Sequence, residues 1–101
     1  MKARILRQTY LDNGFVYLPG FFDAREIAIC QEKIREFIEG LVPQLPRDHV
    51  FYEDRETLST LKQIQQMQDH CPWCDEFMNG KPRALAEELM GKGAVAKNMQ
   101  Y

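Results

Sequence analysis

The chain has 101 residues, 45% of them hydrophobic and 28% charged, which is the composition of one small globular domain and excludes a disordered tail. Thirteen basic and fifteen acidic residues give a net charge of −2 with no block of one sign, so we expect neither nucleic acid nor a membrane as partner. No apolar run approaches the ~20 residues that span a bilayer, and the N-terminus is too polar for a secretory signal. The odd number of cysteines, three, argues against a disulfide framework and favours the cytoplasm.

The first elements along the chain are a predicted helix and a predicted strand. Residues 5–11 place their apolar side chains on roughly one helical face, and Gly14 follows as a stop. Residues 15–18 form a β-branched and aromatic run that is broken at residues 19–20 by Pro-Gly. This run is typical of a short strand that is buried on both faces.

The clearest element of the sequence is a second helix, which begins after Asp23. Asp23 and Glu26 stand three positions apart, as the two members of a capping box do. Apolar residues then recur at helical spacing, with charged residues on the other faces. Gly40 and Pro43 are expected to end this amphipathic helix, which we expect to lie on the core.

The second half of the chain predicts shorter elements. Residues 50–52 indicate a strand, whereas residues 57–67 fit a helix and a strand about equally. Two short helices are expected at residues 72–78 and 82–90, followed by a strand-like alternation at residues 94–101. This order describes helices on one side of a sheet whose other strands are missing. The sequence therefore predicts the opening part of a larger α+β domain, with association through an exposed terminal strand.

The most conspicuous local motif is Cys71-Pro72-Trp73-Cys74, directly after His70. Such a pair at a helix start can support thiol redox chemistry, but the residues before it are polar rather than a buried strand. Structural zinc needs four ligands, and no second pair stands at ligand spacing. A small thiol-redox or zinc-binding module is therefore the alternative function, and simple packing of the two thiols is the preferred interpretation of the motif.

The sequence lacks a complete catalytic centre. Non-haem iron is usually held by two histidines and a carboxylate, often through a His-x-Asp pair, and neither His49 nor His70 has an aspartate two positions on. From composition alone, Lys62 is expected to be a solvated surface lysine. Any chemistry that the chain serves must be completed by residues outside it.

Read together, several segments resemble the N-terminal region of the phytanoyl-CoA dioxygenase family. The most telling is YLDNGFVYLPGFF at residues 10–22, followed by the helix start DAREI at residues 23–27. LKQIQQM at residues 61–67, with its trailing His-Cys-Pro, and LAEELMG at residues 85–91 come next, and VAKNMQY at residues 95–101 is last. The resemblance covers nearly the whole chain, and it depends on the order and spacing of these segments.

The resemblance implies a non-haem Fe(II), 2-oxoglutarate-dependent oxygenase that hydroxylates a small organic substrate. The implied fold is a double-stranded β-helix (jelly roll, cupin-like), of which residues 1–101 would form the N-terminal helices and first strands of a single truncated domain. By position, Lys62 resembles the family lysine that contacts 2-oxoglutarate, and Met99 resembles a residue lining the same pocket, with Tyr101 at its edge.

The resemblance also implies what the chain does not hold. The family's iron ligands and its 2-oxoglutarate-binding arginine would lie downstream, so the fragment should be inactive alone and bind neither Fe(II) nor 2-oxoglutarate tightly. His70 falls where family members often carry His-Asp-Pro at a helix start, and the cysteine pair would then be incidental. A non-catalytic interaction domain that kept this part of the fold is a further hypothesis.

Overall fold

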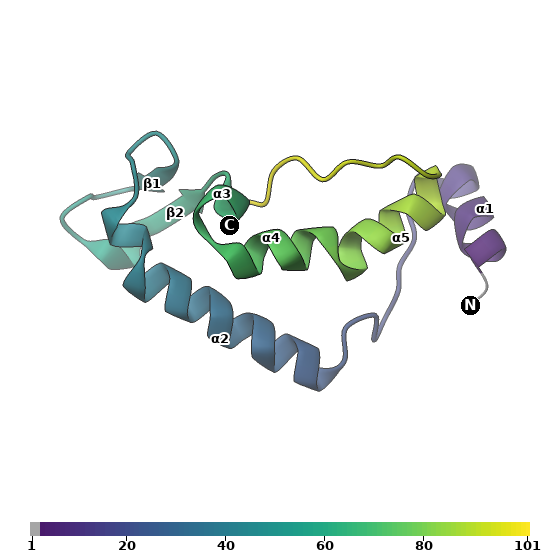
Figure 1. Ribbon diagram of the computed structural model, residues 1–101, viewed down its shortest axis with the longest axis horizontal. Coiled ribbons are helices and arrows are strands. Elements are labelled where there is room, and N and C mark those ends of the chain that lie inside the picture. The colour runs from purple at the N-terminus through teal and green to yellow at the C-terminus, as the bar shows by residue number, and fades with distance from the viewer. Residues whose placement is uncertain (1–2) are drawn as a thin grey trace. The chain divides into compact units, whose positions relative to one another are not determined.

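The computed structural model describes residues 3–101 and shows an α+β protein, with helices and a two-stranded antiparallel sheet. The described chain forms two compact units (Figure 1). The first consists of residues 3–21 and 76–97, and the second of residues 22–75 and 98–101. Within the described range, no helix is both long and apolar enough to cross a membrane.

In the first unit, helix α1 (Ala3–Asn13) packs against helix α5 (Lys81–Met90). Leu6 of α1 and Leu89 of α5 are the buried apolar residues of this pair. Lys81, at the start of α5, donates a hydrogen bond to the carbonyl oxygen of Phe21 and places its ammonium group 4.6 Å from the centre of the Phe21 ring. This cation–π contact fixes the end of the segment that follows α1.

The predicted stop of the first helix is confirmed, whereas the strand predicted after it is wrong. Gly14 has φ +81°, and its N–H donates to the Tyr10 carbonyl at 2.7 Å, which is a helix end that favours glycine. Residues 15–18 form no strand, and the side chains of Phe15 and Tyr17 are 65% and 81% exposed. An apolar run becomes a buried strand only if a neighbouring strand forms hydrogen bonds with its main-chain N–H and C=O groups. In the described chain, no strand pairs with residues 15–18.

In the second unit, helix α2 (Ala24–Gly40) confirms the predicted capping box and the predicted end at Gly40. The Asp23 carboxylate accepts from the N–H of Glu26 at 2.8 Å, and the Glu26 carboxylate accepts from the N–H of Asp23 at 3.0 Å. Only the C-terminal half of α2 lies on the core, through the buried Phe37, because Ile27 near its start is 42% exposed.

Strands β1 (Val50–Tyr52) and β2 (Leu61–Ile64) pair in antiparallel fashion. The ambiguous stretch at residues 57–67 thus contains a strand, preceded by a 3₁₀ turn at Leu58–Thr60 and followed by the short helix α3 (Met67–His70). Helix α4 (Pro72–Asn79) comes next. The core of the second unit lies between this sheet and the helices around it, and its buried members are Phe37, Val42, Val50, Ile64, Met67 and Cys74.

The strand predicted at residues 94–101 is wrong as an element, although its last residues lie beside β2. Residues 94–97 form no helix or strand, and Val95 is 74% exposed. Tyr101 exchanges two main-chain hydrogen bonds with Ile64, at 3.0 and 3.1 Å, as an antiparallel pair does. Since pairing is confined to the end of the segment, the regular sheet remains two-stranded.

Candidate functional site

Lys62 is the extra residue of a β-bulge. Phe51 pairs with Gln63 and Tyr52 pairs with Leu61, so Lys62 is left between two paired positions without a partner in the register. In a regular strand Lys62 would share the face of Ile64, two positions on, which is completely buried. The bulge breaks this alternation, and the Lys62 side chain is 63% exposed.

The carboxylate of Glu53 lies beside Lys62, with 3.6 Å between Oε2 and Nζ. Both side chains are largely exposed, at 63% for Lys62 and 72% for Glu53. An ion pair of this kind contributes at most about 1 kcal/mol to stability. Lys62 therefore presents a cation whose current partner can be exchanged for another anion at little cost.

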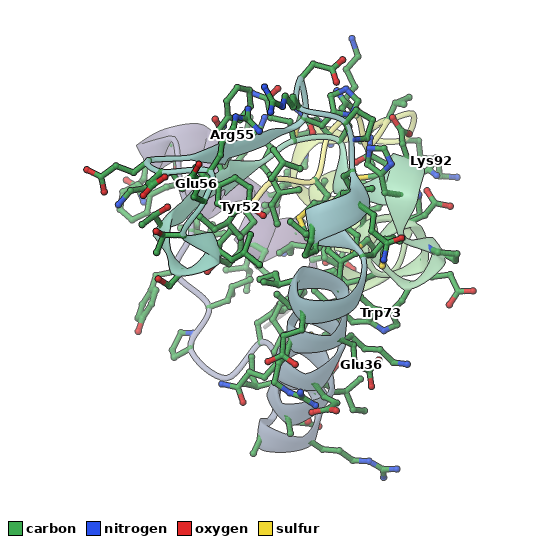
Figure 2. All side chains as sticks on the ribbon, turned by 90° about the vertical axis from the view of Figure 1, so that its left-hand side faces the viewer. Glu36, Tyr52, Arg55, Glu56, Trp73 and Lys92 are labelled. Carbon is green, nitrogen blue, oxygen red and sulfur yellow. The ribbon has the colours of Figure 1, made fainter. Side chains whose placement is uncertain are left out.

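A tightly hydrogen-bonded turn holds Glu53 in place. Its N–H donates to the carbonyl of Thr60 at 3.0 Å, and the Thr60 hydroxyl donates to the carbonyl of Asp54 at 2.8 Å. Figure 2 labels Arg55 and Glu56 in this turn, next to Tyr52 of β1. The Arg55 guanidinium reaches back to the carbonyl of Val50 at 3.4 Å and so ties the turn to β1.

Met99 lies at the corner between β2 and α3. Its N–H donates to the side-chain oxygen of Gln68 at 2.9 Å, and its carbonyl accepts from the N–H of Met67 at 2.9 Å. The side chain of Asn98 accepts from the N–H of Gln66, whose φ of +54° turns the chain from the strand into the helix. The Met99 side chain is partly buried against the core of the second unit.

Lys62 and Met99 have different neighbours in the described part of the chain. Lys62 faces solvent and Glu53, whereas Met99 contacts the apolar core. Tyr101, which was expected at the edge of the same pocket, lines an open groove of about 560 Å³ along α2, together with Ile34 and Ile38. The three residues belong to one unit, but these contacts do not join them into a single pocket.

His49 and His70 are in direct contact, although they lie far apart in the sequence. His49 Nδ1 and His70 Nε2 are 3.0 Å apart, and both side chains are partly buried. The ring centres are 5.2 Å apart. This distance is close to the sum of the 3.0 Å between the two nitrogens and the two ring radii, so the two nitrogens point at each other. One ring must donate an N–H and the other must accept it. No sequence motif indicates this pair, because it depends on how β1, β2 and α3 are placed.

The described residues do not fit an iron centre. Among them, no group of three or more histidine, cysteine, aspartate or glutamate side chains is arranged to hold a metal ion. His49 and His70 supply only two nitrogens, and a facial triad needs a carboxylate as well. For 2-oxoglutarate, the exposed Lys62 ammonium suits one carboxylate, but a dianion requires further partners.

Cys71 and Cys74 form a close pair at the start of α4. The main-chain N–H of Cys74 donates to the Cys71 sulfur at 3.3 Å. Cys74 has no exposed surface, whereas Cys71 is partly exposed. Burial, and then the hydrogen bond to Cys71, raises the pKa of Cys74 to about 12. The two thiols are thus chemically unequal.

Comparison with known proteins gave no relative: no family model, curated protein or solved structure matches the chain.

Proposed function

We propose that this chain is the N-terminal segment of a cytoplasmic non-haem Fe(II), 2-oxoglutarate-dependent dioxygenase that hydroxylates a small organic substrate. The proposal starts from the resemblance of residues 10–22, 61–67 and 95–101 to the phytanoyl-CoA dioxygenase family. In this proposal β1 and β2 are the first strands of a double-stranded β-helix. Three free cysteines among the described residues are in keeping with a reducing compartment.

The observation that carries the proposal is the bulge at Lys62. Bulges are over-represented beside active sites, where they redirect a side chain, and this one turns the ammonium group of Lys62 away from the core. The exposed pair with Glu53 contributes no more than about 1 kcal/mol, so Lys62 can give up this partner at little cost. A carboxylate of 2-oxoglutarate can therefore replace Glu53 as the partner of Lys62.

Iron has no place among the described residues, so in this proposal its ligands belong to a following part of the domain. Iron, with O₂ as the oxidant and 2-oxoglutarate as the two-electron reductant, would supply the chemistry of C–H hydroxylation when bound. The role of this chain is to bind one end of the cosubstrate through Lys62 and to provide apolar surface near Met99. Alone, the chain is expected to be inactive.

The test begins with the reading frame that encodes the chain. We expect it to continue past Tyr101 into a strand with a His-x-Asp pair, and the full-length product to release succinate from 2-oxoglutarate when iron is added. Lys62→Ala should raise the KM for 2-oxoglutarate about tenfold, the equivalent of one lost charge-assisted hydrogen bond.

Lys33→Ala is the matched control, because Lys33 also forms an exposed ion pair, with Glu36 at 3.9 Å. This variant should leave the KM unchanged. A frame that stops directly after Tyr101 would contradict the proposal in favour of a non-catalytic interaction domain. An unchanged KM in Lys62→Ala would remove the role of Lys62 alone.

A further inference from the structure

We propose that Cys71 and Cys74 form a reversible disulfide by exchange with a small-molecule disulfide, with Cys71 as the attacking thiol and Cys74 as the resolving thiol. The pair would be a redox-sensitive site of its own. It does not depend on the proposed oxygenase function, since it involves neither Lys62 nor Met99.

The geometry brings the two sulfurs together. Cys71 directly precedes α4, and Cys74 lies in the first turn, three positions on, where side chains share a helix face. Pro72 between them suits the first helical position, because it has no N–H to leave unpaired there. The Cys71 sulfur accepts a hydrogen bond from the main-chain N–H of Cys74 at 3.3 Å. Formation of a bond between the sulfurs therefore requires only a local adjustment.

The difference in burial between the two thiols determines which of them reacts first with an external disulfide. An external disulfide can reach Cys71, which is partly exposed, but not Cys74, which has no exposed surface. Because its pKa is raised, the Cys74 thiol keeps its proton until a mixed disulfide has formed on the neighbouring Cys71 sulfur.

The exchange balances in two steps. Cys71 loses its proton and attacks one sulfur of the small disulfide, RSSR; the S–S bond breaks, and RS⁻ leaves with the electron pair and takes up a proton. Cys74 then loses its proton and attacks the Cys71 sulfur of the mixed disulfide, releasing a second RSH. Overall, the protein dithiol is oxidised by two electrons to a disulfide, and RSSR is reduced to two RSH.

Cys30 provides an internal control. Cys30 lies on α2 and is partly exposed. Burial is the largest cause that raises its pKa, and the negative charge of Glu26 is the second. No other cysteine lies within one helical turn of it in the chain. Cys30 should therefore react, if at all, only as a single thiol.

The experiment uses the reduced full chain, equilibrated with mixtures of oxidised and reduced glutathione, then quenched with iodoacetamide and mapped by peptide mass spectrometry. In wild type, the Cys71–Cys74 disulfide should exceed the Cys71–glutathione adduct at least about tenfold, because the resolving step is intramolecular. Excess reduced glutathione should reverse it. In Cys74→Ala, the adduct should instead accumulate on Cys71, whereas Cys30→Ala should behave as wild type.

The proposal is overturned if the wild-type chain retains a glutathione adduct on Cys71, or if both thiols stay reduced at glutathione ratios that oxidise a free dithiol. Either result comes from wild type and does not depend on whether Cys74→Ala folds. Circular dichroism of each variant shows whether its result refers to the native chain.

Discussion

His49 and His70 are twenty-one positions apart in the chain, yet their ring nitrogens Nδ1 and Nε2 are only 3.0 Å apart. His49 extends β1, because its carbonyl accepts from the N–H of Gln65 at 2.7 Å, and His70 is the last residue of α3. The ring contact therefore joins the start of the sheet to the helix that follows it. It adds a side-chain link to the main-chain pairing of β1 with β2.

We expect this link to be measurable as a coupling energy. His49→Ala and His70→Ala should each destabilise the second unit, and the double variant should lose about 1 kcal/mol less than the sum of the two. Urea unfolding of the four proteins gives this value. Glu36→Ala, on the exposed face of α2, should be additive with His49→Ala. Additivity within about 0.3 kcal/mol for the histidine pair would mean that it contributes nothing to stability.

The sequence could predict local features of this fold better than features that depend on register. Asp23 and Glu26 reveal their capping box by spacing alone, since all its groups lie within one helical turn. The bulge at Lys62 could not be predicted, because it exists only relative to Phe51 and Tyr52 on the other strand. The strand expected at residues 15–18 failed for a related reason: its apolar residues did not reveal whether a partner strand exists.

The capping box should contribute measurably to stability. Asp23→Ala removes the acceptor for the N–H of Glu26 and should cost about 1 kcal/mol. Asp23→Asn keeps a side-chain oxygen and should retain most of that stability. The two variants are compared by thermal and urea unfolding. Equal losses would show that the charge of Asp23, and not its hydrogen bond, stabilises the start of α2.

Ile64 should be the most sensitive apolar position of the sheet, because its side chain has no exposed surface and contacts the core of the second unit. Ile64→Val should cost about 1 kcal/mol and Ile64→Ala about 2–5 kcal/mol, as a cavity replaces the lost groups. Leu58→Ala is the control, since Leu58 is 57% exposed and should change stability by no more than about 0.5 kcal/mol. A similar loss at both positions would contradict the assignment of the core.

Lys62 should contribute little to stability, in contrast to Ile64 on the same strand. Its ion pair with Glu53 is exposed on both sides, so Lys62→Ala and Glu53→Ala should each shift the free energy of unfolding by less than about 1 kcal/mol. Denaturant titration at low and high salt measures this, and any small effect should shrink at high salt. A loss above about 2 kcal/mol would mean that Lys62 has a structural role. A raised KM for 2-oxoglutarate in Lys62→Ala would then reflect the lost stability and not a lost contact with the cosubstrate.

The buried thiol of Cys74 should make stability depend on alkaline pH. Its pKa is raised from 9.0 to about 12 in the folded chain, so the unfolded chain loses this proton at lower pH than the folded one. The stabilisation is therefore complete below pH 9 and is lost as pH rises toward 12, by about 1 kcal/mol between pH 8 and pH 10. Cys74→Ala removes the titrating group and should lack this component, which urea unfolding of both proteins at the two pH values would reveal. Identical pH dependence in the two proteins would show that the Cys74 thiol ionises as readily in the folded chain as in the unfolded one.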